Sequence, residues 1–170
     1  MSLAALHMES DSLDPRRFRT VIGAFATGVA VITTAFEGAF HGMTINSLTS
    51  VSLDPCLLLV CPRRGSATGA AIRGSGAFAV NIRAADQRDL SHRFVRADIA
   101  ERFAELDIEL GPRGVPLLPG AIAHLCCRVS AIHPGGDHEI VVGEVRTCSD
   151  AGGHPLLFHK GSFGAFRGDA

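Results

Sequence analysis

The order of β-rich and helical segments constrains the fold of this chain most strongly. Six or more segments have the apolar, β-branched composition of strands, whereas only two or three short segments show helical spacing. A parallel, doubly wound sheet requires strand and helix to alternate throughout the chain. The sequence therefore predicts a mainly β fold, in which an antiparallel sheet closes into a barrel with a few short peripheral helices.

Cap and turn residues divide the chain into its predicted elements. Asp14 and Pro15 predict the start of a helix that we expect to end at Gly28. Ser66 is expected to cap a second short helix. The predicted strands cover residues 29–34, 39–43, 51–60, 77–82, 121–133, 139–149 and 156–166, and the predicted helices after the first cover residues 67–72, 86–94 and 98–106. We expect residues 1–13 to be a flexible N-terminal segment and residues 14–170 to form a single domain.

Composition excludes several classes of function. The formal net charge is −1, so there is no general excess of positive charge for binding nucleic acid. The five cysteines form no CxxC pair, and no histidines show metal-site spacing, so no metal site is expected. No apolar run is long enough to span a bilayer, and no signal peptide is evident, so we expect a cytoplasmic protein without membrane association.

A polar strand-like segment, residues 41–55, is the most informative candidate for function. It carries five hydroxyl side chains and Asn46, whereas an apolar run, residues 57–60, follows directly. A strand that only filled a core would not need so many polar groups. The segment is therefore expected to meet a flat, polar ligand along its edge and backbone.

Common catalytic and nucleotide-binding motifs are missing from the sequence. It contains no GxGxxG fingerprint, no P-loop and no GxSxG nucleophile elbow. Residues 63–68 offer two arginines and hydroxyls before a predicted helix, which suits a phosphate cradle. Taken alone, however, they fit a solvated turn with an N-cap better. His138 follows a Gly-Gly-Asp turn that explains its neighbours but not an imidazole, so a functional and a purely structural role both remain open.

In order along the chain, several motifs together resemble the short-chain flavin reductase family, the NAD(P)H:flavin oxidoreductase partners of two-component monooxygenases. Each motif is weak alone, but their order from residue 18 to residue 166 is a strong signal. They are FATGVAVITT (25–34), GMTINS (42–47), SVSLDP (50–55), FAVN (78–81), RF (102–103), GDH (136–138), GEV (143–145) and PLLFH (155–159).

The resemblance implies an FMN-binding split barrel of Greek-key type and a homodimer with flavin near the subunit interface. Carried over by position, the flavin-binding residues would be Thr44, Ile45, Asn46, Ser47, Ser50, Val51, Gly65, Ser66, Ala67, Thr68, Asn81 and Phe94. Ala26, His138 and Phe163 would face the nicotinamide, with His138 as the catalytic candidate. Tyr is common in the family where Phe163 stands, although a phenyl ring can also stack.

The implied reaction is hydride transfer from nicotinamide C4 of NADH or NADPH to flavin N5 of FMN or FAD. This chemistry belongs to the cofactors, which accounts for the missing acid–base motif. Reduced flavin would then diffuse to a partner monooxygenase. Two alternatives remain: a flavin-binding protein of the same fold without nicotinamide activity, and a β-barrel interaction module whose polar strand faces solvent.

Overall fold

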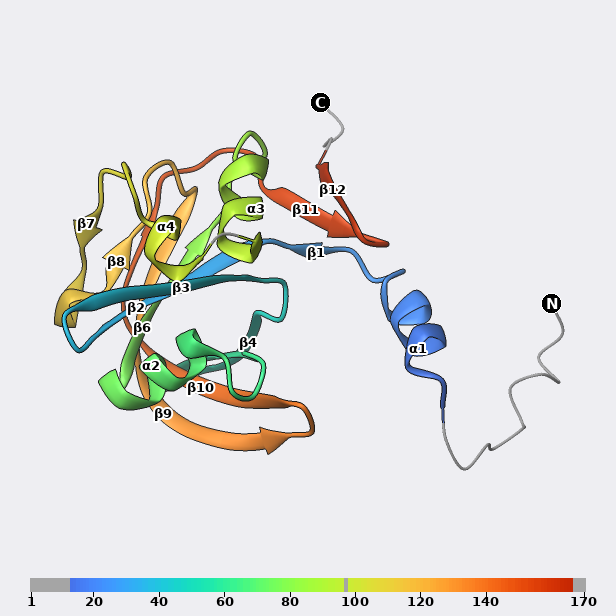
Figure 1. Ribbon diagram of the computed structural model, residues 1–170, viewed down its shortest axis with the longest axis horizontal. Helices are drawn as coiled ribbons and strands as arrows, with labels where there is room; N and C mark the ends of the chain where they lie inside the picture. The colour runs from blue at the N-terminus through green and yellow to red at the C-terminus, as the bar shows by residue number, and fades with distance from the viewer. Residues whose placement is uncertain (1–12, 97, 167–170) are drawn as a thin grey trace, which may run out of the picture.

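A large antiparallel sheet dominates the computed structural model, which describes residues 13–96 and 98–166 (Figure 1). The predicted flexible segment 1–13 lies almost entirely outside these residues. In spatial order, the sheet contains β3 (Ala39–Ile45), β2 (Ala30–Phe36), β6 (Ala77–Ile82), β9 (Ala123–Gly135), β10 (His138–Asp150), β5 (Cys56–Val60) and β4 (Thr49–Leu53). The mainly β prediction is thus confirmed. Within the described residues no ladder pairs edge strand β3 with edge strand β4, so barrel closure is not confirmed.

Smaller elements surround this sheet. A second sheet has the order β1 (Thr27–Gly28), β11 (Leu156–His159) and β12 (Ser162–Ala165), and β7 (Glu109–Leu110) pairs with β8 (Pro116–Leu117). The helices are α1 (Pro15–Ile22), α2 (Ala67–Ser75), α3 (Arg88–Arg96) and α4 (Ile99–Arg102), with a 3₁₀ turn η2 (Pro112–Gly114). In Figure 1, α2 and α3 lie on either side of β3, and α1 projects away from the main sheet.

The hairpin of β2 and β3 follows directly from its turn residues. Glu37 and Gly38 have φ values of 50° and 75°, the left-handed conformation that a tight turn between twisted strands requires. Residues 30–34 of β2 are all buried, and Ile32 packs with Phe78 and Val80 of β6 in the main core. This hairpin places the polar half of β3 at the edge of the sheet, beside α2 and α3.

Several predicted bounds are wrong. The predicted strand 156–166 is two paired strands, β11 and β12, and the predicted helix 98–106 is shortened to α4. In two further cases strand pairing prevails over local sequence. The first helix ends with Gly23 as its cap, and not at Gly28, because Thr27 and Gly28 pair with β11. The predicted strand 51–60 is in fact two strands, β4 and β5, which form a hairpin around Asp54 and Pro55. Proline lacks the N–H that a continuous ladder needs, so the chain reverses there.

Thiol reactivity offers a direct check of the packing. Cys126 and Cys127 are buried, Cys61 is half-buried, and Cys56 and Cys148 are exposed. Burial, with a smaller contribution from Cys126, raises the pKa of the Cys127 thiol to about 12, and burial also raises the pKa of Cys61. Because the thiolate is the reactive form, a thiol reagent at neutral pH should modify Cys56 and Cys148 quickly, Cys61 slowly, and the buried pair only after unfolding. Rapid modification of Cys127 in the folded protein would contradict this packing.

The described helices include none that is long and apolar enough to cross a membrane.

Candidate functional site

The start of α2 presents polar groups at one end of the candidate site. Ser66 is the N-cap, and its hydroxyl accepts a hydrogen bond from the Gly69 amide at 3.2 Å. Gly65, with φ of 77°, takes the left-handed conformation that leads the chain from Arg63 and Arg64 into this cap. The first amides of a helix have no partner within it and carry the positive end of the helix dipole. This end of α2 therefore suits an anionic group.

The corner after β3 holds further hydroxyl groups. The Thr44 hydroxyl donates to the Ser91 carbonyl of α3 at 2.7 Å, which ties the strand to that helix. Ser47 accepts a hydrogen bond from the Cys61 amide at 3.1 Å and thereby anchors the corner to the end of β5. Asn46 lies between them and is exposed. The backbone of this corner is thus fixed at both ends.

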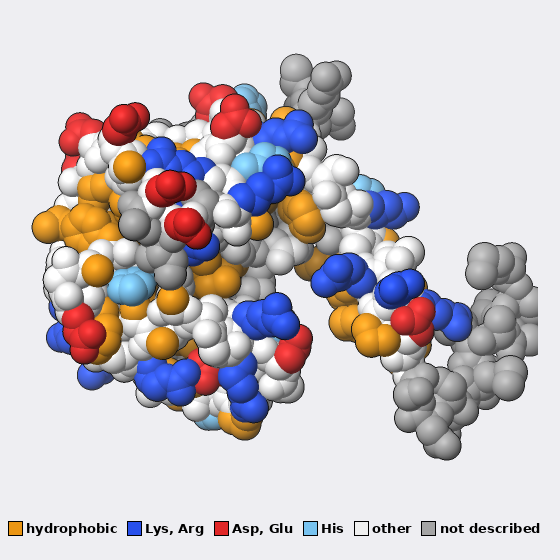
Figure 2. All heavy atoms as spheres, viewed as in Figure 1, with side chains coloured by type: hydrophobic (Ala, Val, Ile, Leu, Met, Phe, Trp, Pro, Cys, Tyr) orange, Lys and Arg blue, Asp and Glu red, His pale blue; other side chains and the backbone are white. Residues whose placement is uncertain are grey.

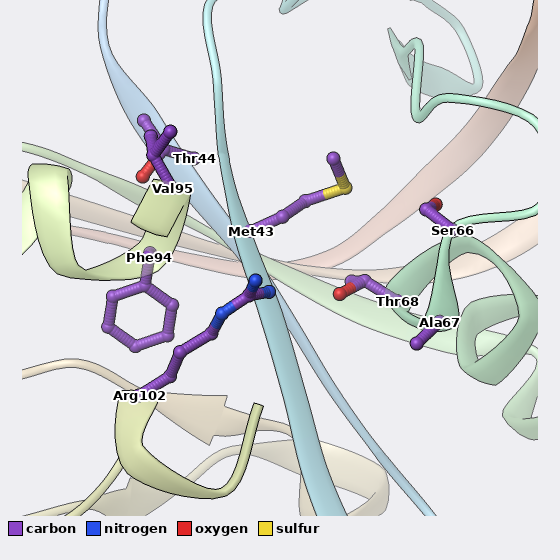
Figure 3. A pocket seen from close by; sticks show the side chains of 8 residues that line it. All are labelled: Met43, Thr44, Ser66, Ala67, Thr68, Phe94, Val95 and Arg102. Carbon is purple, nitrogen blue, oxygen red and sulfur yellow. The ribbon is translucent and has the colours of Figure 1, made fainter. Parts of the chain in front are cut away.

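A cavity of about 340 Å³ joins these elements (Figure 3). Its walls come from β3, α2, α3 and α4, and its lining residues are Met43, Thr44, Ser66, Ala67, Thr68, Phe94, Val95 and Arg102. In Figure 3, the Met43 side chain extends from β3 toward Ser66, and the Arg102 side chain extends toward the side where Thr68 lies. The cavity therefore combines apolar surface with hydroxyls and one guanidinium.

A close approach of backbone and rings shapes this wall. A Cβ atom on Gly42 would lie 2.8 Å from Phe94 and 3.0 Å from Phe103, so only glycine lets β3 pack on these rings without displacement. The Phe94 and Phe103 rings meet edge to face with centroids 5.0 Å apart. Arg102 donates to the Gly42 carbonyl at 2.7 Å, which places its charge at the cavity.

The sequence predicted some of these lining residues but not all of them. Of the predicted flavin residues, the structure brings Thr44, Ser66, Ala67, Thr68 and Phe94 together at the cavity. It adds Met43, Val95 and Arg102, to which the sequence assigned no role. Arg102 stood in a recognised motif, but nothing in the sequence indicated that α4 would bring its side chain back to β3.

Four predicted flavin residues are buried: Thr68 and Phe94, which line the cavity, and Ile45 and Asn81, which do not. Asn81 is 0% exposed; its amide donates to the Val31 carbonyl at 2.9 Å and to Thr33 Oγ1 at 3.0 Å, and its carbonyl accepts from the Leu118 amide at 2.8 Å. These contacts engage both ends of the amide within the protein and give the Asn81 side chain a structural role, while its contact with flavin stays a prediction. Ile45 also points inward, at 7% exposure, within the main core.

The remaining predicted flavin residues do not line the cavity, although several are neighbours of lining residues in the chain. Ser50 and Val51 are exposed on β4, the opposite edge strand of the main sheet. Gly65 precedes the cap residue, and Asn46 and Ser47 form the corner between the two edges.

His138 lies at the start of β10, beside the turn that contains Arg63 and Arg64. Its Nδ1 atom is 2.8 Å from Oδ1 of Asp137, and the hydrogen bond from His138, followed by its charge, lowers the pKa of the Asp137 carboxyl. Arg63 pairs with His138 in an isolated bridge, and the Arg64 amide donates to the Asp137 carbonyl at 2.9 Å. The imidazole is thus held next to the turn that leads into Ser66, although it is not part of the cavity lining.

The other predicted nicotinamide residues share the small sheet. Ala26 is exposed and directly precedes β1, and Thr27 of β1 lies opposite Phe158. Phe163 of β12 in turn lies opposite Phe158. The structure therefore brings Ala26 and Phe163 to one sheet, and it places His138 apart from them on the β9–β10 hairpin.

Among the described residues, no group of three or more His, Cys, Asp or Glu side chains is arranged to hold a metal ion. The cavity presents hydroxyls, helix amides and Arg102, which can bind and orient an anionic ligand with a flat ring.

Comparisons with known proteins agree with this chemistry. The model of the flavin reductase like domain matches residues 22–167. The reductase subunit HsaB of a flavin-dependent monooxygenase from Rhodococcus jostii is 41% identical over 155 residues, covering 91% of this chain and 79% of the relative. The FMN reductase (NADH) SmoA from Agrobacterium fabrum is 45% identical over 151 residues, covering 89% of this chain and 86% of the relative.

A solved structure shows the same fold. The NADH:FAD oxidoreductase SgcE6 of Streptomyces globisporus, in complex with NAD and FAD fragments, superposes with a TM-score of 0.85 at 36% identity, covering 95% of this chain and 99% of that chain. The resemblance seen in the sequence motifs is thus confirmed over nearly the whole chain. This chain belongs to the flavin reductase family.

Proposed function

We propose that this chain reduces flavin with NADH and binds the flavin in the cavity between β3, α2 and α3. The observation that carries the proposal is the lining of that cavity, where apolar surface meets the hydroxyls at the start of α2 and the guanidinium of Arg102. In a chain of this family, such a lining matches a flavin, which combines a flat ring with an anionic phosphate. SmoA, an FMN reductase that uses NADH, supports the choice of NADH.

The residues present fit the flavin in character. Ser66, Thr68 and the first amides of α2 would hold the phosphate, because a helix N-terminus favours an anion. Met43 and Val95 would contact the flat ring, and Arg102 would stabilise negative charge on the flavin. When bound, the flavin supplies the redox chemistry by accepting hydride from nicotinamide C4 at N5.

The protein residues are therefore expected to bind and orient, without a nucleophile or an acid–base pair. Ala26 and Phe163, in the small sheet, would contact the nicotinamide, and His138 would orient it or supply a hydrogen-bond donor. Stacking the nicotinamide and flavin rings at about 3–3.5 Å requires a binding site whose residues are held in fixed positions. The hydrogen bonds of Thr44 and Ser47 support that requirement, because they fix both ends of the polar corner.

A steady-state assay tests this function. Purified protein is combined with NADH or NADPH and with FMN or FAD in turn, and oxidation of the reduced nicotinamide is followed. The proposal predicts oxidation that depends on added flavin and is fastest with NADH. Bound flavin without oxidation in any combination would instead indicate a flavin-binding protein, and absence of flavin binding would leave only an interaction module.

Replacement of His138 by alanine should lower turnover with little change in flavin affinity. The expected loss is about 10-fold, the size of one good hydrogen bond to a charged or reacting group. His133, on the same hairpin, provides the matched histidine-to-alanine control. Flavin titrations measure the flavin affinity, and steady-state rates measure the turnover. A collapse of flavin affinity in His138→Ala would show that His138 contacts the flavin and not the nicotinamide.

The reduced flavin would be delivered to a partner monooxygenase by diffusion. HsaB, the reductase subunit of a flavin-dependent monooxygenase, supports a monooxygenase as the partner. An open cavity of hydroxyls and one guanidinium suits a ligand that must leave after reduction. The partner and its substrate are not specified by any residue of this site.

A split barrel is the form of the sheet that we propose. Its two edge strands, β3 and β4, are consecutive in the chain and are connected by residues 46–48 alone. So short a connection supports a sheet that curls until its edges meet at this corner, since a flat sheet of this strand order would hold them far apart. The predicted flavin residues Asn46 and Ser47 would then lie at the seam.

The projecting helix α1 supports a homodimer. None of its residues is buried, and Phe18, Val21 and Ile22 are 56%, 67% and 53% exposed, with Phe25 just beyond at 73%. Figure 2 shows hydrophobic side chains among arginines on this projecting part. Such a contiguous apolar face is typical of a contact surface. We expect a second copy of this chain to cover it.

Substitution of Val21 by aspartate should therefore disrupt the dimer. In a two-fold interface each change occurs twice, so a loss of about 1.5 kcal/mol per copy weakens association by about 100-fold or more. Analytical ultracentrifugation of the wild type should give a dimer, and of Val21→Asp a monomer at the same concentration. Thr20→Asp, on the opposite face of α1, should remain dimeric. A wild-type monomer, or a dimeric Val21→Asp variant, would contradict the proposed interface.

A further inference from the structure

His92 is a residue for which the sequence predicted no role, and it connects the cavity to the small sheet. It lies on α3 and is half-buried, and its ring meets the ring of Phe163 edge to face, with centroids 4.8 Å apart and planes at 81°. Phe163 in turn meets Phe158 with centroids 5.6 Å apart. The three rings form a continuous row from α3 across β12 to β11.

The residues next to His92 on α3 contact β3 and the cavity. The Ser91 carbonyl accepts the hydrogen bond from Thr44 of β3, and Phe94 and Val95 line the cavity. His92 is on the same short stretch of helix and faces Phe163 instead. This turn of α3 thus contacts both the proposed flavin cavity and the proposed nicotinamide residue.

The small sheet needs such support because its outer strand is remote from the main sheet. Backbone hydrogen bonds from Val29 to Leu156 and from Leu156 to Arg83 attach β11 to the body of the protein. The outer strand, β12, pairs with β11 on one side, and it is an edge strand of that sheet. Within the described part of the chain, the His92–Phe163 pair is the ring contact between β12 and α3.

We propose that His92 is a positioning residue for nicotinamide binding, acting through Phe163. This proposal rests on the proposed function and specifies one part of it: the His92 ring fixes the orientation and distance of the Phe163 ring relative to the cavity. The Phe163 ring is then already ordered when NADH binds to the flavin-loaded protein. A loose Phe163 ring would have to be ordered at the expense of NADH affinity.

His92→Ala is the primary variant, and it is compared with variants that retain a ring. The proposal predicts that the KM for NADH and the Kd for NAD⁺, measured by calorimetry on the FMN-loaded protein, both rise about 3- to 10-fold, the range expected for one aromatic pair. The Kd for FMN and the value of kcat should stay within about twofold. His92→Phe should restore the KM and the Kd for NAD⁺, because the edge-to-face contact needs a ring and not its nitrogen atoms.

Controls separate this role from a general loss of structure. His159→Ala changes an exposed histidine of the same small sheet and should leave all four quantities unchanged. Phe163→Leu breaks the pair from the other side, and the double variant should be no worse than Phe163→Leu alone, since both remove one contact. Melting curves of each variant should remain cooperative.

Three results would overturn the proposal: an unchanged Kd for NAD⁺ in His92→Ala, a parallel loss of FMN affinity, or additive effects in the double variant. Failure of the proposed function has a different signature. A wild-type protein that binds NAD⁺ but never oxidises NADH with FMN or FAD would contradict flavin reduction, and the NAD⁺ titrations of the variants would still decide the role of His92.

Discussion

Replacement of Arg102 by methionine should weaken FMN binding by about 10- to 100-fold. The guanidinium lies at the cavity wall, where it donates to the Gly42 carbonyl, and methionine keeps much of its length without charge or donors. A hydrogen bond to a charged group contributes about 1.5–3 kcal/mol, which corresponds to that loss. The chain has no Trp or Tyr, so quenching of flavin fluorescence can be followed without interfering protein emission.

Two further variants interpret the result. Arg102→Lys retains the charge but not the planar fork, so it should lose less affinity than Arg102→Met. Arg146→Met removes an arginine that pairs with Glu144 on β10, away from the cavity lining, and should bind FMN like the wild type. If Arg102→Met and Arg146→Met bind FMN equally well, the flavin does not lie against Arg102 and the proposed site is wrong.

Replacement of Asn81 by leucine should lower the free energy of unfolding by about 3–5 kcal/mol. The substitution keeps the volume roughly constant but removes all three hydrogen bonds of the side chain, and it leaves the buried Val31 carbonyl and Leu118 amide without their partner. An unsatisfied buried group costs about 1–3 kcal/mol. In a chain of this size, the melting temperature should fall by roughly 10 °C or more.

The matched control places the same substitution at an exposed asparagine. Asn46→Leu, at the corner after β3, should shift the melting temperature of the flavin-free protein by little. Both variants are melted at one protein concentration, because association also contributes to apparent stability. A melting temperature for Asn81→Leu close to that of the wild type would mean that the Asn81 amide does not stabilise the fold.

Elements with strong local signals could be predicted from the sequence. The strand predicted over residues 77–82 matches β6, and the predicted cap at Ser66 is confirmed. Each depends on residues adjacent in the chain, whose backbone preferences determine the local structure. The end of α1 could not be predicted, because pairing of Thr27 with β11, far away in sequence, stops the helix.

The site shows the same division. Ser66, Ala67 and Thr68 form one helix start, so the predicted cap at Ser66 also locates Ala67 and Thr68. Asn81 illustrates the opposite case: a polar residue in an apolar strand has the same pattern whether it contacts a ligand or neighbouring strands. Only the folded structure shows that the Asn81 amide bonds the backbone of Val31 and Leu118. His92 and Arg102 were missed because their roles depend on the packing of α3 and α4 against distant strands.

The most direct test of the central claim is an anaerobic reaction of the purified protein with NADH and FMN. The visible absorbance of oxidised FMN and the near-ultraviolet absorbance of NADH are recorded together after mixing. Flavin reduction by this chain predicts that both fall in a one-to-one ratio and far faster than in a mixture without protein. If the two signals decay no faster than in the protein-free mixture, the chain does not transfer hydride between these ligands, and the account of the cavity as a flavin reductase site is contradicted.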